Sequence, residues 1–579
     1  MAVEKLIVDH IDIWTTALQT RSTAGRGSSG KIELYGIKKL RELILELAVR
    51  GKLVPQDPND EPASVLLERI AAEKSELVKQ GIIKKPKPLP EISEEEKPFE
   101  LPEGWEWVRL GFISNYGFCD KAEPEDVTPD TWILELEDIE KVTSKLLNKV
   151  TFTERPFKSS KNRFSQGDVL YGKLRPYLDK VIVANEPGVC TTEIIPITSY
   201  GNIYPEFLRL LLKAPNFIIY ANSSTHGMNL PRLGTEKAQL AVIELAPIQE
   251  QMRIVSRVNK LMAVCDQLEQ HSLTSLDAHQ QLVETLLTTL TNSQNADELA
   301  ENWARISEHF DTLFTTEASI DALKQTILQL AVMGKLVSQD PNDEPASELL
   351  KRIAQEKAQL VKDGKIKKQK PLPPISDEEK PFELPDGWEW SRLDHIASKI
   401  TDGDHKTPPR IAEGYKLLSA KNIRDGFLDY ENCDYISESS YIKSRERCLP
   451  EKGDLLIVSV GGTIGRSSLI TGDSEFALVR SVAIIKPLII ESNFLKIAMD
   501  SQLLQSMIHS HKRGGAQPCL YLGEISKFLF PVPPLKEQKR IVKTVNIFMG
   551  ILETLTLAFK SAQQTQLHLA DALTDAAIN

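Results

Sequence analysis

Residues 99–107 read FELPEGWEW and residues 382–390 read FELPDGWEW, so one nine-residue phrase occurs twice with a single acidic residue exchanged for another. The match continues on the N-terminal side of the phrase. Residues 41–110 align with residues 324–393 at a constant offset of 283, and 52 of these 70 positions are identical. So long a period indicates duplicated domains, because a solenoid repeats every roughly 20 to 50 residues.

A second match follows each copy of the phrase, at an offset of 287. APIQEQMRIVSRVNKLM, which starts at Ala246, pairs with PPLKEQKRIVKTVNIFM, which starts at Pro533. Between the phrase and this second match lie two inserts, roughly 111–245 and 394–532, which show little identity to each other. The chain therefore has the order arm, insert, helix, and then again arm, insert, helix.

The repeated segments have the apolar spacing of helices. Ile37 and Ile44 would share one helical face that ends near Gly51, and the second copy repeats this spacing. A longer apolar stripe follows Gln251, and its counterpart follows Gln538. Ordinary core packing explains either stripe alone. As a duplicated pair they favour two long helices packed antiparallel, which would hold the two inserts at a fixed distance.

A proline-rich and charged segment, KKPKPLPEISEEEKPFELPEGWEW, leads from each arm into its insert. Its composition predicts an extended strap, and the alternation in GWEW predicts the first strand of the insert. The fold class is therefore α+β, with two mixed α/β domains separated by long antiparallel coiled-coil helices in a pseudo-twofold internal repeat. The predicted boundaries are an N-terminal arm and strap 1–107, a first insert domain 108–246, a central repeat region 247–390, a second insert domain 391–533 and a C-terminal helix 534–579.

The composition is ordinary for a soluble globular protein, with 41% hydrophobic and 26% charged residues in a chain of 579. No window approaches 18 uncharged apolar residues, and the N-terminus lacks a signal-peptide core. The six cysteines are scattered without the spacing of a metal site or a disulfide framework. We therefore expect a cytoplasmic protein with free thiols, no metal and no membrane contact.

Duplicated halves should stay alike where they meet two copies of one partner, and they can diverge where they meet two different targets. Two unlike domains on a symmetric frame suit a bipartite linear ligand, and double-stranded DNA is the obvious candidate. Two such domains at a fixed separation would read half-sites roughly one helical turn, ~10 base pairs, apart or slightly more.

The residue types of the inserts fit contacts with bases and phosphates. Arg and Lys suit guanine edges, Asn and Gln suit adenine, and glycines such as Gly461 allow the backbone to approach a phosphate. For any single residue, a solvated surface charge is the competing interpretation. The candidate DNA-binding residues are Lys161, Asn162, Arg163, Lys173, Arg175 and Tyr177 in the first insert, and Lys406, Thr407, Lys421, Asn422, Arg424, Arg466, Lys512, Arg513 and Gln517 in the second.

The net charge of −11 argues against DNA binding by electrostatics alone. Residues 108–247 contain 16 basic and 17 acidic residues, and residues 391–533 contain 18 and 17, so most of the excess acid lies in the arms. We therefore expect the isolated chain to bind DNA weakly and partner subunits to complete a positive channel.

Two variable inserts, each opened by LP-x-GW-x-W and closed by a P-x-x-EQ-x-RI helix, resemble the specificity subunit of Type I restriction-modification enzymes. The resemblance covers nearly the whole chain from about Gly36. The repeated arm with DPNDEPAS is similar to the branch of that family whose conserved regions precede each insert. Residues 1–35 lie outside the match.

The resemblance implies that residues 108–245 and 391–532 are target recognition domains, each reading one half of a split, asymmetric DNA site. The helices after Gln251 and Gln538 would form the spacer and dock two methyltransferase subunits, which use S-adenosylmethionine. Two restriction-translocase subunits, which use ATP and Mg²⁺, would join this complex. The chain itself would hold no cofactor and have no catalytic residue. The docking and spacer residues would be Glu250, Gln251, Arg253, Ile254 and Val258, and their copies Glu537, Gln538, Arg540, Ile541 and Val545.

Two other functions are weighed against this one. A methyltransferase or nuclease would need an NPPF- or DPPY-like pocket and a glycine-rich cofactor loop, which the sequence lacks. GRGSSGKI from Gly25 has phosphate-loop spacing, but Ile32 stands where Mg²⁺ needs Ser or Thr, so a flexible linker is the better interpretation. A scaffold for two identical proteins without DNA binding would explain the repeats, but it leaves the two unlike inserts unexplained.

Overall fold

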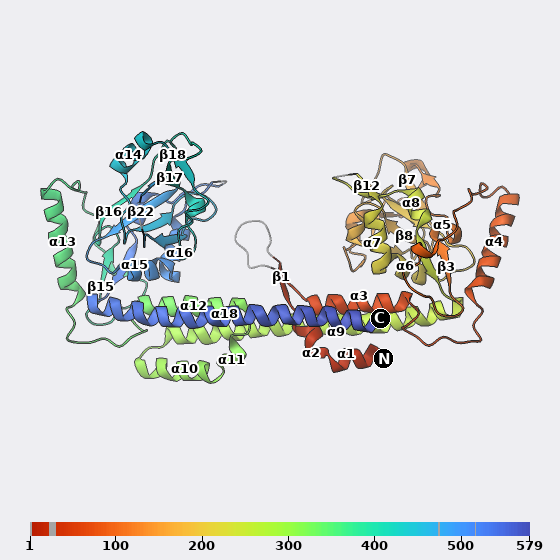
Figure 1. Cartoon of the computed structure of the whole chain (residues 1–579), viewed down its shortest axis with the longest axis horizontal. Coiled ribbons are helices and arrows are strands. Elements are labelled where there is room, and N and C mark those ends of the chain that lie inside the picture. Colours follow the sequence, from red (N-terminus) through yellow and green to blue (C-terminus); the bar gives the residue numbers. More distant parts are fainter. Residues whose placement is uncertain (1–2, 22–30, 228, 473–474, 516, 579) are drawn as a thin grey trace. The chain divides into compact units, whose positions relative to one another are not determined.

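The computed structural model describes residues 3–21, 31–227, 229–472, 475–515 and 517–578, so most of the GRGSSGKI segment lies outside the described residues. Among the described residues, two compact units divide the chain. The first unit comprises residues 3–21, 31–274 and 563–578, and the second comprises residues 275–562. Each unit contains a helical frame, an arm and a sheet-containing domain (Figure 1).

Three helices form the frame of the first unit, and their contacts fix their directions. Arg41 Nη2 donates to Asp266 Oδ1 at 2.7 Å, and Gln56, just after α3, donates to Glu250 at 3.1 Å, so α3 runs antiparallel to the start of α9. Tyr35 Oη donates to Asp571 at 2.7 Å and Lys52 Nζ donates to the carbonyl of Ile578 at 2.5 Å, which sets α3 parallel to the end of α18. The elements are α1 (Val3–Asp9), α2 (Ile11–Thr16), β1 (Gln19–Arg21), β2 (Lys31–Glu33), α3 (Tyr35–Val49), α9 (Ile248–Asn292) and α18 (Leu535–Ile578).

The frame of the second unit repeats this arrangement, but α18 takes the place that α9 has in the first unit, and α9 takes the place of α18. Lys335 Nζ donates to the carbonyls of Thr291 and Ser293 at 2.8 and 2.9 Å, beside the end of α9. Lys560 of α18 pairs with Glu317 at 2.9 Å. The remaining helices are α10 (Ala296–Glu308), α11 (Phe310–Leu313) and α12 (Glu317–Val332).

Lys52 and Lys335 occupy equivalent positions at an offset of 283, and each places its ammonium group against the last carbonyls of a long helix. A cation at this point complements the negative end of the helix dipole. The repeat also extends into the N-terminal residues, because HIDIWTT at 10–16 resembles HFDTLFTT at 309–316. The internal repeat therefore begins earlier than the sequence comparison indicated, because these segments precede α3 and α12 in equivalent places.

Each arm consists of one helix followed by an extended strap. Arg109 donates to both carboxylate oxygens of Glu96 at 2.7 and 2.9 Å, and Arg392 repeats this contact with Glu379. These pairs attach each strap to the first strand of the domain that follows it. The arm elements are α4 (Ala63–Lys79), η1 (Glu94–Glu96), α13 (Ala346–Lys362) and η5 (Asp377–Glu379).

The domain of the first unit is a set of small sheets flanked by helices. It opens and closes with one antiparallel pair, in which Trp107 lies opposite Glu244. A five-stranded sheet has the order β4-β7-β10-β5-β6, and a three-stranded sheet has the order β11-β8-β9. The strands are β3 (Glu106–Arg109), β4 (Lys121–Ala122), β5 (Trp132–Leu134), β6 (Val150–Thr151), β7 (Lys161–Phe164), β8 (Val169–Gly172), β9 (Val181–Val183), β10 (Gly188–Cys190), β11 (Ile194–Ile197), β12 (Thr225–His226), β13 (Arg232–Leu233) and β14 (Val242–Leu245); the helices are α5 (Leu110–Ile113), α6 (Pro205–Lys213), α7 (Pro215–Ser223) and α8 (Thr235–Leu240).

The domain of the second unit has the same frame-side pair, in which Trp390 lies opposite Pro531. Its larger sheet has the order β16-β22-β19-β20, and a three-stranded sheet has the order β18-β17-β21. The elements are β15 (Glu389–Arg392), β16 (Ala397–Asp402), β17 (Tyr415–Leu418), β18 (Asp434–Ile436), α14 (Glu438–Arg447), β19 (Leu455–Val458), β20 (Ser467–Leu469), β21 (Phe476–Leu478), β22 (Val482–Pro487), α15 (Ser492–Asp500), α16 (Gln502–His511), α17 (Leu522–Ile525) and β23 (Leu529–Val532). The predicted α+β class, with long helices and two sheet-containing domains, is confirmed.

One helix of the described residues, α18, is long and apolar enough to cross a membrane by length and composition alone. A core helix of a soluble protein passes the same test. Ile541, Val545 and Leu552 of this helix are buried in the core of the second unit. Its opposite side leaves Ile547 and Ile551 exposed. We therefore interpret α18 as a frame helix with one apolar side open to contact.

Candidate nucleic-acid interface

Two loops lie side by side at one edge of the first domain, and we call them the first loop pair: residues 172–178 and residues 225–233. The amide of Arg175 donates to the carbonyl of Pro231 at 2.7 Å, and the amide of Leu233 donates to the carbonyl of Lys173 at 3.0 Å. The β12–β13 hairpin that carries the second loop is seen in Figure 1. The backbone bonds hold both loops in one surface.

The second domain repeats this construction in the second loop pair, residues 459–466 and residues 511–520. The amide of Gly461 donates to the carbonyl of Pro518 at 3.0 Å, and the amide of Leu520 donates to the carbonyl of Ser459 at 2.8 Å. Each bond is the counterpart of one in the first loop pair at an offset of 286 or 287. The inserts thus share a backbone plan that their sequences do not show.

The side chains of the first loop pair leave basic and aromatic groups open to solvent. Arg175 is exposed and Tyr177 is 53% exposed, while Lys173 is half-buried. Neither Arg175 nor Lys173 has an ion-pair partner among the described residues. Arg175 and Asp179 both adopt left-handed backbone, with φ of 53° and 48°. This conformation costs energy in a residue with a side chain and is often kept at functional sites.

A buried ion pair braces the end of the first loop. Lys213 Nζ lies 2.5 Å from Asp179 and also donates to the hydroxyl of Ser144 and the carbonyl of Val142, both at 2.8 Å. Burial raises the pKa of Asp179 to about 6, although the Lys213 ammonium opposes the shift. The strained turn is therefore held by a network on its inner side, which leaves the outer side chains free for a ligand.

The second loop pair presents different groups at the same positions. Lys512 and Gln517 are exposed, and Arg513 is exposed with only a long contact of 3.6 Å to Glu524. Arg466 is partly buried and lies 3.4 Å from Asp425. The shared backbone with unlike side chains is what two different half-sites would require.

In the second domain the surface extends to the loop at residues 402–411. The amide of Arg480 donates to the carbonyl of Asp404 at 3.0 Å, and the amide of Ser459 donates to the carbonyl of Ser481 at 2.9 Å. These bonds bring the exposed Lys406 and Thr407 to the same side as the second loop pair. Arg480 is exposed at the centre of this surface, and sequence reasoning missed it because it stands alone between two apolar strands.

A cluster of charged side chains holds this loop in place. Arg447 Nη2 lies 2.7 Å from Asp402 Oδ1 and 2.7 Å from His405 Nε2, and the same His nitrogen lies 3.1 Å from Asp402 Oδ2. Ser444 of the same helix donates to Asp404. His405 therefore helps to position the backbone beside Lys406 and Thr407.

Two predicted asparagines lie inside the domains. Asn162 is 1% exposed and donates to the carbonyl of Ile194 at 2.8 Å. Asn422 is fully buried and donates to the carbonyls of Asp429 and Asn432 at 3.0 and 3.1 Å. Both amides satisfy buried backbone groups, so their placement leaves nothing for a base edge.

Four predicted cations also lie away from the loop pairs or are already paired. Lys161 is mostly buried in an ion pair with Glu135. The others lie beside acids: Arg163 with Asp126 at 3.6 Å, Lys421 with Asp434 at 3.2 Å, and Arg424 with Asp429 at 3.6 Å. The charge pattern of the sequence could not show the partners of Lys161 and Arg163, because Glu135 and Asp126 lie in distant parts of the chain, whereas Asp429 is only five residues from Arg424.

The predicted docking residues Glu250 and Gln251 point into the first unit. Glu250 is 1% exposed and accepts from Trp105 Nε1 at 3.0 Å and from Gln56 at 3.1 Å. Gln251 is fully buried, donates to the carbonyl of Ala246 at 2.8 Å and accepts from the amide of Tyr204 at 3.0 Å. The motif ties the long helix to the domain and the arm.

The second copy of the motif makes equivalent bonds. Glu537 accepts from Gln339 at 3.1 Å, and Gln538 accepts from the amide of Glu491 at 2.9 Å. Arg540 pairs with Asp343 at 2.8 Å, as Arg253 pairs with Asp60 at 2.5 Å. The predicted spacer residues on the apolar side, Ile254, Val258, Ile541 and Val545, are all buried in the two cores.

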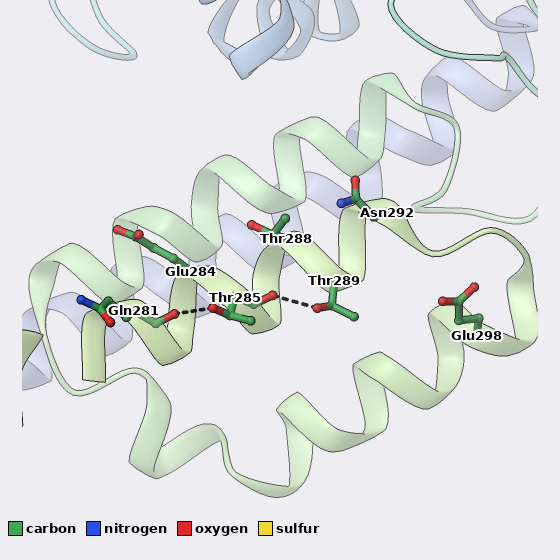
Figure 2. A pocket seen from close by; sticks show the side chains of 7 residues that line it. All are labelled: Gln281, Glu284, Thr285, Thr288, Thr289, Asn292 and Glu298. Carbon is green, nitrogen blue, oxygen red and sulfur yellow. Dashed lines mark hydrogen bonds between the residues drawn. The ribbon is translucent and has the colours of Figure 1, made fainter. Parts of the chain in front are cut away.

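A shallow groove of about 600 Å³ lies on α9 and α10 of the second unit (Figure 2). A threonine row lines it, with Thr285 donating to the carbonyl of Gln281 at 2.7 Å and Thr289 donating to the carbonyl of Thr285 at 2.9 Å. The hydroxyls of Thr285 and Thr289 are therefore satisfied within the helix. Within the described ranges, no group of three His, Cys, Asp or Glu side chains could hold a metal ion.

The class that this fold and surface define is a duplicated frame carrying two unlike binding domains. A family profile described as the Type I restriction modification DNA specificity domain matches residues 385–558. The chain is 52% identical over the full length of both chains to the Type I restriction enzyme EcoAI specificity subunit of Escherichia coli. It is 49% identical, again over both full lengths, to the EcoEI specificity subunit of the same organism. This chain belongs to the specificity subunits of Type I restriction-modification enzymes, and its role is the DNA sequence recognition for which that family is named.

Two solved structures are also similar to this chain over most of its length. A chain from a study of complex assembly and conformational transition of the type I R-M system covers 83% of this chain and 99% of its own length, at 19% identity and a TM-score of 0.48. The HsdS subunit of Thermoanaerobacter tengcongensis covers 83% of this chain and 98% of its own length, at 19% identity and a TM-score of 0.39.

Proposed function

We propose that each sheet-containing domain reads one half of a bipartite, asymmetric DNA site through its loop pair. The domains would be residues 108–246 and 391–533. The observation that carries the proposal is the repeated backbone plan of the loop pairs, which present unlike exposed side chains. Arg175 and Tyr177 would contact DNA in the first domain, and Lys512, Arg513 and Gln517 in the second. Arg or Lys would read guanine and Gln adenine in the major groove.

The frame would dock two identical methyltransferase subunits, and two restriction-translocase subunits would join the complex in the cytoplasm. Contacts that recur in both units, such as Gln56 with Glu250 and Gln339 with Glu537, keep the two frames alike. The partner surface would be the outer sides of the same helices, because the motif residues are buried. Ile547 and Ile551 are exposed apolar residues of this kind.

The chemistry would belong to the partners. S-adenosylmethionine would be held by the methyltransferase subunits and ATP with Mg²⁺ by the restriction subunits, and this chain would hold no cofactor. Directing adenine methylation or restriction to one sequence would be the contribution of this chain.

The test is a genome-wide map of N6-methyladenine in cells that carry this chain with its cognate methyltransferase. A split motif with a fixed unread gap is expected. Exchanging residues 108–245 for the insert of another family member should change one half-site and leave the other intact. Unchanged methylation in an assembled complex would instead favour a scaffold that binds two identical subunits and no DNA.

A further inference from the structure

A cavity of about 570 Å³ lies in the first unit, where the strap passes the edge of the domain. We call it the strap cavity. Its walls are mostly apolar and come from Pro90 and Pro98 of the strap, Phe217 and Tyr220 of α7, and Leu240 of α8. The rings of Phe217 and Tyr220 have centroids 6.4 Å apart. Such walls fit an aliphatic stem, and the faces of the rings attract a cation.

One carboxylate lines this cavity without a partner side chain. Glu244 of β14 is 5% exposed, and its carboxylate meets no donor among the described residues except its own backbone amide. Burial raises its pKa to about 8, and the nearby Glu46 carboxylate adds to the shift, while Arg50 opposes it. An ionised carboxylate in such a place needs a cation to balance the loss of water.

The other charged groups around the strap cavity are paired or lie at its mouth. Glu46 is bonded to Arg50 at 2.8 Å, and Glu96 is bonded to Arg109 at 2.7 Å. At the mouth, the acid of Glu95 and the base of Lys237 are both exposed. Tyr220 uses its hydroxyl to donate to the carbonyl of Lys237 at 2.7 Å. Glu244 is thus the one buried carboxyl lining the cavity to which no described side chain donates a hydrogen bond.

The second unit lacks these groups at the equivalent positions. Pro531 stands at the position of Glu244, opposite the second tryptophan of the phrase. Gln329 stands at the position of Glu46 and Met333 at that of Arg50, at an offset of 283. Gln329 instead accepts from the amide of Leu503 at 3.1 Å. The buried Glu244 therefore has no counterpart in the second unit, and a function common to both units does not explain it.

We propose that the strap cavity binds an alkylammonium or guanidinium group on an aliphatic stem, with Glu244 as its counter-ion. The stem packs against Pro90, Phe217 and Leu240, and the charged end reaches the carboxylate. This goes beyond the DNA-reading role, because the cavity belongs to the joint of strap and domain and not to the loop pair. The group is either a basic side chain of a partner subunit or a free polyamine.

The probe is agmatine, which carries a guanidinium and an amine on a four-carbon stem, titrated calorimetrically into the full chain at pH 8.5. Saturable binding is expected, weakened about tenfold or more by Glu244→Gln, because removing one partner of a buried ion pair leaves the other charge uncompensated. Glu106→Gln, on the neighbouring strand and outside the cavity, is the matched control and should bind like the wild type. Ile219→Arg adds an exposed cation at the mouth that can fill the cavity, so it should also abolish binding.

The binding should tighten with pH, because the carboxyl must lose its proton to pair with the cation. Between pH 7 and pH 9 the affinity should rise about tenfold, since the ionised fraction rises by that factor around a pKa near 8. In the Glu244→Gln variant the remaining binding should not follow this pH dependence.

The same titration on the chain assembled with its methyltransferase separates the two sources. Loss of agmatine binding on assembly assigns the cavity to a basic side chain of that subunit, and retained binding assigns it to a free cation. No saturable binding by the wild type, together with unchanged assembly of Glu244→Gln, would overturn the proposal. The methylated sequence motif is a separate readout, so failure here leaves the DNA-reading role untouched.

Discussion

Gln251 and Gln538 show how much one side chain can fix. Each side-chain amide joins the start of a long helix to a nearby carbonyl and to the backbone amide of the residue just before a helix of the domain, α6 or α15. The sequence predicted that the two residues matter, because both copies keep them. It could not predict that they point inward, since a short motif does not say which side of its helix is covered.

Replacing Gln251 by Leu should destabilise the chain. The substitution leaves the buried amide of Tyr204 and the carbonyl of Ala246 without partners, which costs about 1–3 kcal/mol of the free energy of unfolding for each unsatisfied group. Urea unfolding measures the change. Gln355→Leu, at an exposed position of α13, is the control and should stay within about 0.5 kcal/mol of the wild type. An equal loss in both variants would contradict the role of the buried amide.

Arg175→Ala and Arg513→Ala should each weaken recognition of a different half-site. A base-reading arginine contributes about 1–3 kcal/mol of discrimination. Methylation mapping of the assembled complex should therefore show relaxed specificity in one half only, and in opposite halves for the two variants. Arg163→Ala is the control, because Arg163 already lies beside Asp126 away from the loop pair. Relaxation of both halves by one variant would refute the assignment of one domain to one half.

At the scale of elements, the sequence predicted the class of each domain but not which loops lie together, as the two loop pairs show. The sequence predicted that each insert is a mixed α/β domain, and both domains contain strands and helices. The pairing of the loop after β8 or β19 with the hairpin some 50 residues later depends on backbone hydrogen bonds, which no side-chain pattern records. The candidate list consequently mixed exposed residues such as Arg175 with buried ones such as Asn162.

Strand β14 should make the first unit sensitive to pH through Glu244. Its pKa is raised from 4.5 to about 8, so the folded state favours the protonated form. The contribution of Glu244 to the free energy of unfolding is fully present below pH 4.5. As the pH rises from 4.5 to about 8, this contribution falls by at most about 1.4 kcal/mol for each pH unit. Glu244→Gln removes this loss, so urea unfolding should show the variant gaining on the wild type across that window. A constant difference at all pH values would contradict the raised pKa.

At the scale of the molecule, duplication was readable because the frame residues are copied almost unchanged. The domain order arm, insert, helix follows from the repeat alone. The N-terminal residues were the exception, since HIDIWTT and HFDTLFTT share too few residues to be aligned without the elements that follow them. The side chains that determine the length and the bases of each half-site differ between the two copies. The repeat therefore carries no information about the half-sites.

Lengthening a long helix should change the gap between the half-sites and leave both half-sites the same. Inserting four residues of high helix propensity after Ser272 would add about 6 Å to a continuous helix, which is close to two base pairs of DNA. Methylation mapping of the variant should show the same two half-sites with a longer unread gap. An unchanged gap in an active complex would show that α9 does not set the spacing.

The division of α18 between the units has a consequence for synthesis. The second unit is a continuous stretch of chain, whereas the first takes residues 563–578 from the extreme C-terminus, where Asp571 bonds to Tyr35 and the Ile578 carbonyl to Lys52. Domains generally fold in the order in which the ribosome releases them. Here the unit that begins first can be completed only last. The nascent first half must wait, with the α3 surface uncovered, until residues 563–578 have been synthesised.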